Sequence, residues 1–198
     1  MTIKSAVDGE SLRASDINAY YANNGLKYVA RTSISPAAAG LVLYSCFTSE
    51  FDAYRVVLSD INSTTAGAAF NLMIQFATAG TTPYTGATYQ YIINGVSYAG
   101  GALAGNGNNV GYIYLGDTQG LTGARKNGGV LDIISKSGSK PTVSGFMSDN
   151  SGAAITNGKV WFVNGFVNNA ATYTGFRIYN AGGSTVGGTL TVYGYRKQ

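Results

Sequence analysis

The carboxylates are the residues in this sequence that could carry out catalysis. There are nine Asp and Glu residues, and the pairs closest in sequence are Asp8 with Glu10 and Glu50 with Asp52. A glycosidase needs two carboxyl groups held across a cleft. Glu50 and Asp52 instead flank the start of an expected strand, where charged side chains more often solvate a turn. We therefore expect no enzyme, and a depolymerase acting through these carboxylates stays as an alternative.

Other reactive groups are scarce. The chain has no His and a single Cys, Cys46, so the protomer cannot build a His-based triad or an ordinary zinc site. Cys46 lies in the apolar run 41–47, which favours a small buried core residue over a reactive thiol. The turn-like stretches 60–63 and 149–152 could offer oxygens to calcium but lack its spaced acidic ligands. We expect no metal and no other cofactor.

Tyrosine is the residue type most suited to contacts with a partner. Rings of this kind can stack on sugars while neighbouring amides bond the hydroxyls, and Tyr is also enriched in protein interfaces. The same rings could simply fill sheet faces or subunit seams, as we expect for Trp161. The sequence leaves open which of these roles belongs to the six tyrosines of its middle third: Tyr84, Tyr89, Tyr91, Tyr98, Tyr112 and Tyr114.

One short helix can be read near the start of the chain. Ser15 is a good N-cap, and Gly25 is a natural residue to end the helix. Ile17, Tyr20 and Tyr21 form an apolar stripe at helical spacing. A helix this short is not stable alone in water, so its stripe must dock on its own domain or on another protein.

From residue 41 onward the apolar pattern has a period of two, which is typical of strands with one buried face. Such runs lie at 41–47, 52–60, 70–77, 87–93, 109–116, 129–135, 142–147, 159–167, 176–179 and 189–196. Turn-forming residues separate them at 64–67, 79–80, 105–109, 127–129, 149–152 and 181–183. About ten short strands predict an all-β fold, a jelly-roll-like β-sandwich.

The stretch between the helix and the strands is mixed in character and reads as a hinge around Pro36. We therefore expect an N-terminal attachment segment at 1–31, a linker at 32–40 and a β-sandwich domain at 41–198.

The composition bears on the partners. Charged residues make up 11% of the chain, well below the roughly 25% of an ordinary soluble domain, so we expect surface to be covered in a homo-oligomer. A net charge of +4 without a basic cluster gives no reason to expect nucleic acid. The chain begins without the apolar stretch of a secretory signal and has no run of ~20 apolar residues. We expect a soluble protein made in a cytoplasm, without membrane insertion.

Three stretches of the chain are distinctive: 7–18, 47–57, and 175–180 together with 188–195. They resemble stretches in structural proteins of tailed bacteriophages, particularly fibre, appendage and decoration proteins. Residues 7–18 are similar to the fibre-type start, in which an Asp-Gly turn leads into an Ala-Ser-Asp-Leu-Asn helix. Residues 47–57 are similar to a strand pair of phage sandwich domains. Residues 175–180 and 188–195 resemble the closing hairpin of those domains, with its Tyr-Gly terminus. The middle of the chain, 79–128, follows no pattern of this family.

The resemblance implies a virion component, commonly a homotrimer, that is assembled in the host cytoplasm and carries no active site. It implies that the N-terminal segment docks onto other virion proteins while the sandwich is displayed outward. We assign the docking contacts to Leu12, Ile17, Tyr20 and Tyr21. A tail fibre that binds a host surface glycan and a capsid decoration, cement or head-fibre protein both stay open. A carbohydrate-binding module outside any particle is the alternative from another class.

Overall fold

The computed structural model describes residues 25–63, 69–78, 82–119, 127–149, 158–180, 182 and 186–196. Within them every regular element is a strand, and the strands form two antiparallel sheets, as in a β-sandwich. The large sheet has the order β1-β12-β3-β8-β9-β10-β5-β6, and the small sheet has the order β2-β11-β4-β7. The strands are β1 (Leu26–Ala38), β2 (Gly40–Leu43), β3 (Phe51–Ser63), β4 (Ala69–Ala77), β5 (Tyr89–Ser97), β6 (Ala102–Val110), β7 (Ile113–Gln119), β8 (Asn127–Ile134), β9 (Thr142–Asp149), β10 (Lys159–Val167), β11 (Gly175–Asn180) and β12 (Val186–Arg196).

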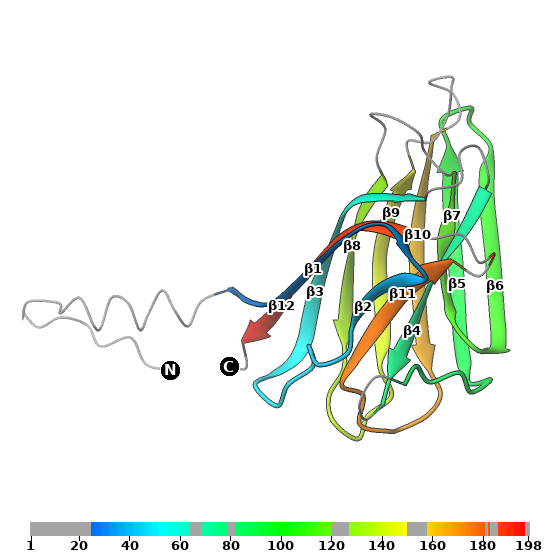
Figure 1. The fold of residues 1–198 in the computed structure, drawn as a ribbon. Coiled ribbons are helices and arrows are strands. Elements are labelled where there is room, and N and C mark those ends of the chain that lie inside the picture. The colour runs from blue at the N-terminus through cyan, green and yellow to red at the C-terminus, as the bar shows by residue number, and fades with distance from the viewer. Residues whose placement is uncertain are drawn as a thin grey trace, which may run out of the picture.

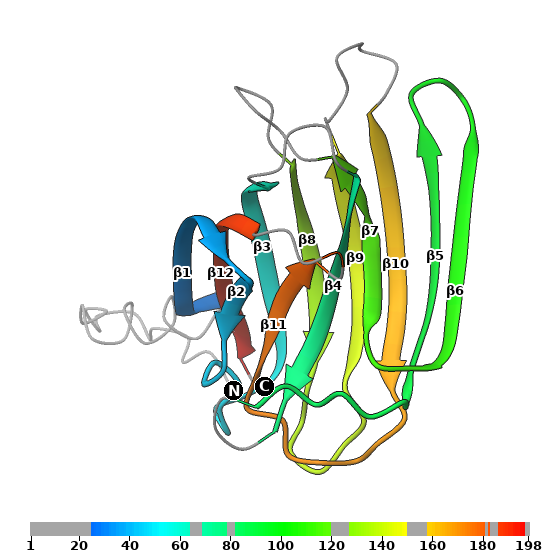
Figure 2. The same cartoon turned by 45° about the vertical axis from the view of Figure 1, so that its right-hand side comes forward.

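The small sheet lies against one face of the large sheet (Figure 1). Its strand β2 contacts β1 and β12, and its strand β7 contacts β9, β10 and β5. Strands β5 and β6 lie at one end of the large sheet and β1 lies at the other (Figure 2). The other face of the large sheet is not covered by any strand that the structure describes.

The core confirms the period of two for β3, whereas in β4 the residues between the core positions are buried as well. Leu72, Ile74 and Phe76 of β4 are fully buried between the sheets, and so are Tyr54 and Val56 of β3. Each large apolar side chain buried in this way stabilises the fold by about 1.5–3 kcal/mol relative to exposure. The alternating pattern therefore accounts for why these residues form strands and which face turns inward.

An aromatic cluster closes the core at the β3–β12 side. Phe47 lies 4.7 Å from Tyr54 and 5.8 Å from Phe176, measured between ring centroids. Phe51 packs edge-on against Tyr54 at 5.9 Å. Gly194 of β12 makes room for this cluster, because a Cβ at that position would run into the Phe51 ring.

The stretch that the sequence predicted as a linker, 32–40, contains the end of β1 and the first residue of β2. β1 pairs with β12 from Leu26 to Ala38, with irregular register between Ile34 and Ala38. Pro36 falls in this irregular part, and a proline without an N–H is tolerated there because β1 is an edge strand. The backbone thus joins residues from 26 onward to the sandwich.

Two predicted turns are wrong. Residues 105–109 lie inside β6, and 127–129 begin β8. Gly and Asn have low strand propensity, which is why both stretches look like turns. Pairing with β5 on one side and with β3 and β9 on the other overrides that preference.

The predicted N-terminal helix and the four docking residues Leu12, Ile17, Tyr20 and Tyr21 lie outside the described residues. Across the residues that are described, no helix has the length and hydropathy of a membrane span.

Candidate functional site

The solvent-facing side of the large sheet carries large apolar side chains. Ile92 of β5 is 60% exposed and Phe162 of β10 is 58% exposed, and Phe146 of β9 and Val96 of β5 are also exposed. We call this surface the outer face and define it by seven exposed side chains: Ile92, Asn94, Val96, Asn106, Phe146, Phe162 and Asn164. Four of the eight large apolar side chains that are exposed in the described part of the chain lie on it, and it is our candidate site.

The strand register places apolar and amide side chains next to one another on the outer face. Asn106, Ile92 and Asn164 lie opposite one another on β6, β5 and β10. In the adjacent row Asn94 lies opposite Phe162, which lies opposite Phe146. Directly opposite residues have Cβ atoms about 5 Å apart, so each row is nearly continuous. The rows combine apolar area with amides that both donate and accept hydrogen bonds.

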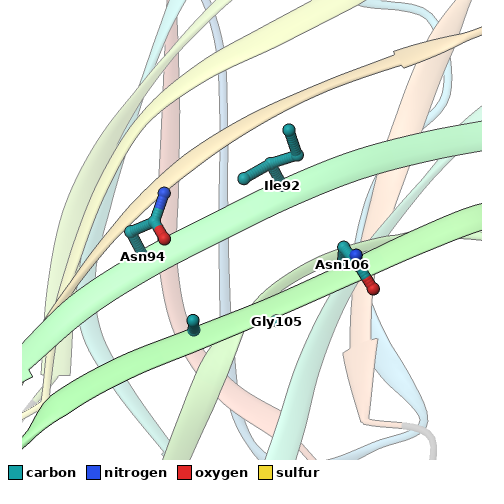
Figure 3. A pocket seen from close by; sticks show the side chains of 5 residues that line it. Ile92, Asn94, Gly105 and Asn106 are labelled. Atoms are coloured by element: carbon teal, nitrogen blue, oxygen red, sulfur yellow. The ribbon is translucent and has the colours of Figure 1, made fainter.

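An open hollow of about 410 Å³ lies between β5 and β6 on the outer face. Ile92 and Asn94 stand beside it on β5, and Gly105 and Asn106 lie on β6 (Figure 3). A second hollow of about 320 Å³ continues from it toward Phe166 of β10. Neither hollow is lined by a carboxylate. The shape suits a broad contact rather than an enclosed reaction site.

The β5–β6 part of the outer face belongs to an uncharged stretch of the chain. Residues 61–116 contain no Asp, Glu, Lys or Arg, and they include all of β4, β5 and β6. Covering a charged group costs desolvation energy unless the charge is paired. At the β5–β6 end of the sheet a partner can cover the outer face without that cost.

The charges gather toward the β1 end of the sheet. Arg55 of β3 donates from Nε and Nη2 to the two carboxylate oxygens of Asp132 on β8, at 2.9 and 2.8 Å. The Tyr195 hydroxyl donates to the same carboxylate at 2.8 Å. The hydrogen bond from Arg55 lowers the pKa of Asp132, and the bond from Tyr195 adds to this effect. Lys27 and Glu50 form a second, exposed ion pair at 2.6 Å.

The six tyrosines singled out in the sequence do not form one surface. Tyr89 is fully buried, and its hydroxyl donates to the Tyr84 carbonyl at 2.8 Å and accepts from the Phe76 N–H at 3.1 Å. Burial raises the pKa of Tyr89. Tyr84 packs against Tyr89 and Tyr173. Tyr89 therefore belongs to the core of the sandwich, and Tyr84 is partly buried against it.

Three of the remaining four come together beside the edge of the small sheet. The ring of Tyr91 lies 6.3 Å from that of Tyr112 and 6.2 Å from that of Tyr114. Gly107 of β6 lies under Tyr91, since a Cβ there would clash with the ring. Tyr98 is separate and exposed after the end of β5. The predicted glycan or interface role of this set stays a prediction.

Cys46 and Trp161 are core residues, as the sequence predicts. Cys46 is buried, its thiol donates to the Leu43 carbonyl at 3.3 Å, and burial raises its pKa to about 12. Trp161 of β10 is also buried, and its ring lies edge-on to the Tyr114 ring with 6.3 Å between the ring centroids.

The carboxylate pair Glu50 and Asp52 lies at the start of β3, away from both hollows of the outer face. Glu50 is occupied by the ion pair with Lys27. Among the described residues no three His, Cys, Asp or Glu side chains come close enough to hold a metal ion.

Sequence reasoning missed the outer face because it looked for one buried face per strand. The signal was present in strands that are apolar on both sides. Ile92 and Ile93 are neighbours, and Phe162 stands between Trp161 and Val163. In each case one residue is buried and its neighbour is exposed.

Comparison with known proteins identifies no relative. No protein-family model, no curated protein and no solved structure matches this chain.

Proposed function

We propose that this chain is a non-enzymatic structural protein of a bacteriophage particle. In this role residues 1–31 attach it to other virion proteins, with contacts from Leu12, Ile17, Tyr20 and Tyr21 on a short helix. A jelly-roll-like sandwich is displayed as a homo-oligomer for assembly and for attachment to the host surface, as in a tail fibre or receptor-binding protein. The alternative within the same class is a capsid decoration, cement or head-fibre protein.

The outer face is the observation that carries this proposal. Phe162, Phe146 and Ile92 are exposed on adjoining strands, and the chain around Ile92 has no charged residue. A soluble monomer gains nothing by exposing a contiguous apolar surface, and such surfaces mark contact sites. Burial of apolar area contributes roughly 25 cal/mol per Å², so a protein partner on this face would stabilise an assembly.

The family-like stretches support the proposal from a second direction. Residues 47–57 include the start of β3, and 188–195 lie in β12, which pairs with β3. Phe176 of β11 packs on Phe47 at 5.8 Å. The glycine of the Tyr-Gly terminus, Gly194, is required by the close approach of Phe51. Segments that resemble one family and are far apart in the chain thus form one packed unit.

The direct test is the composition of the particle. The chain should be present at a fixed copy number in purified virions, and electron microscopy should place its sandwich with the outer face against neighbouring protein. The lysine variant Phe162→Lys should lower the copy number, while the matched variant Tyr28→Lys, at an exposed aromatic of β1, should not. Absence of the chain from purified virions would refute the proposal.

The location of the chain separates the two versions of the proposal. A fibre should be found on tails and should bind host cells or their glycans. A decoration protein should bind empty heads and raise the temperature at which they break.

Carbohydrate binding is the second candidate, because the hollow between β5 and β6 combines an aliphatic side chain with amides. Ile92 could contact the apolar side of a sugar while Asn94 and Asn106 bond its hydroxyls. This candidate predicts that the purified chain binds glycans on an array and that Asn94→Ala reduces the binding. Equal glycan-array signals from the wild-type chain and from Asn94→Ala would rule out carbohydrate binding in this hollow.

A further inference from the structure

Strand β6 forms an edge of the large sheet, and no other described strand pairs with its free side. The β5–β6 ladder fixes which backbone groups face that side. The Ser97 N–H donates to the Gly101 carbonyl at 2.9 Å and the Ser97 carbonyl accepts from the Gly100 N–H at 2.8 Å, so both backbone groups of Ser97 point toward the strand that follows. Hydrogen-bonded and non-hydrogen-bonded pairs alternate along an antiparallel ladder. The register then runs without a break to Gln90 opposite Asn108.

This alternation divides the residues of β6 into two sets. Residues 103, 105 and 107 direct their N–H and C=O groups toward β5. Residues 102, 104, 106 and 108 direct theirs away from β5, to the free edge. The side chains of the second set are exposed as well. The edge of β6 therefore presents a row of regularly spaced donors and acceptors.

We propose that a second copy of this chain pairs with this row, antiparallel, about a two-fold axis. The two β6 strands would lie side by side and the two large sheets would continue into one. The inference deepens the proposed role in assembly by naming the partner as the chain itself. It differs from the three-fold association that the family resemblance implies, because an antiparallel pair of identical strands has two-fold symmetry.

The free groups of β6 fit such a pair. An axis between the two copies of Gly105 places Ala104 opposite Asn106 of the second copy, and Ala102 opposite Asn108. Each hydrogen-bonded pair exchanges two bonds, so the seam would hold about eight backbone hydrogen bonds. The small side chains of Ala102 and Ala104 leave space for the amides that face them.

The chemistry of β6 favours its own copy. Pairing a strand with itself brings like residues close together, which repels when they are charged. No residue from 61 to 116 is Asp, Glu, Lys or Arg, so the seam is free of that repulsion. The side-chain amides of Asn106 and Asn108 can each donate and accept hydrogen bonds, so the same residue can act as donor in one copy and as acceptor in the other.

The opposite edge strand of the large sheet, β1, has features that prevent pairing with another chain. Natural edge strands are protected from pairing by cations, prolines and bulges. β1 has exposed Lys27 and Arg31, Pro36, and irregular register at two places. β6 has no charge and no proline, and its one bulge, at Asn109, lies at the end of the strand, so residues 102–108 pair with β5 without a shift of register. The difference points to β6 as an edge that is meant to be covered.

Pairing at β6 would also join the two outer faces. Ile92, Asn94 and Val96 of each copy lie one strand away from the seam. The dimer would present one uninterrupted apolar and amide surface to the next protein of the particle.

The test is the mass of the purified full chain in solution, by sedimentation and native mass spectrometry. The expected species has about 41 kDa, twice the 20.5 kDa of the chain. Asn106→Lys places two cations at the seam, and Ala104→Pro removes an outward N–H without touching the β5 ladder; both should give monomers. Tyr28→Lys, the matched lysine on the other edge strand, should stay dimeric. Circular dichroism checks that each variant is folded.

Three results would overturn the inference: a wild-type monomer at every soluble concentration, a trimer, or a dimer that persists in folded Asn106→Lys. The measurement uses no virion, so its failure leaves the proposed function standing. Absence of the chain from virions, with a dimer intact, would instead refute the proposed function alone.

Discussion

The two ends of the large sheet differ in whether their exposed side chains are paired within the chain. Toward the β1 end, charged side chains are paired within the chain: Asp132 accepts hydrogen bonds from Arg55 and Tyr195, and Lys27 pairs with Glu50. At the β5–β6 end, residues 61–116 have no charge, and apolar and amide side chains face solvent. The first arrangement satisfies its polar groups within the chain, and the second leaves its contact groups for a partner.

This difference teaches where to look for function in an all-β chain without a catalytic cluster. Internal ion pairs report on stability. An uncharged edge and an uncovered apolar face report on association, because only a partner can use them. The two ends should therefore respond to mutation in different measurements.

The largest expected difference is between two phenylalanines. Phe51 is buried in the cluster with Tyr54, and Phe51→Ala should lower the free energy of unfolding by about 3 to 5 kcal/mol. Phe162 is exposed, and Phe162→Ala should lower it by about 0.5 kcal/mol or less. Urea denaturation of the two variants measures both. Similar losses would mean that the outer face is part of the fold and not a contact surface.

The next effect concerns the charged network at the β1 end. Asp132→Ala removes the partner of Arg55 and Tyr195, but the Arg55 and Asp132 side chains are both 39% exposed. Solvent screens such a pair, so we expect a loss of about 1 kcal/mol in the free energy of unfolding. A double-mutant cycle with Arg55→Ala isolates the pair. Asn94→Ala on the outer face is the control and should leave unfolding unchanged.

The same network predicts a pH dependence. The pKa of Asp132 is lower in the folded chain than its ordinary value, because Arg55 and Tyr195 donate to the carboxylate. The contribution of the Asp132 carboxylate to the free energy of unfolding is therefore complete above the pKa of about 4 that the group has in the unfolded chain. It is lost as the pH falls through the lower pKa of the folded chain. The stability difference between wild type and Asp132→Asn should be present at neutral pH and should disappear in acid. A difference that grows in acid would contradict this assignment.

The smallest effect is expected for Lys27 and Glu50, whose side chains are 44% and 50% exposed. Glu50→Gln should change the free energy of unfolding by about 0.5 kcal/mol or less. Salt at about 1 M shortens the screening length to roughly 3 Å, comparable with the separation of this exposed pair, and should clearly reduce that change. A salt-resistant loss would show a structural role that the exposure does not suggest.

Much of the sandwich could be predicted from the sequence. The period of two located the core residues of β3, β4 and β10, because side chains on the same face of a strand recur at every second position. β6 and β1 were not found. β6 consists largely of Gly, Ala and Asn, and only its pairing with β5 makes it a strand. β1 carries Pro36 and irregular register, which in a sequence look like a hinge.

The candidate site was harder to predict than the core. Its residues lie on separate strands, and a sequence does not show which strands are adjacent. Phe146 and Phe162 are opposite one another only because β9 pairs with β10. The tyrosines attracted attention because of their type, yet register and layer place Tyr89 inside and Tyr98 outside.

Amide hydrogen exchange along the two edge strands tests the central claim most directly. In the wild-type chain, the outward amides of Ala104 and Asn106 should be protected at high protein concentration, and the protection should fall on dilution. Exposed edge amides of β1 should exchange rapidly at every concentration. Rapid exchange at Ala104 and Asn106 under all conditions would show that nothing pairs with β6, and that the uncharged end is not where this chain meets its own copy.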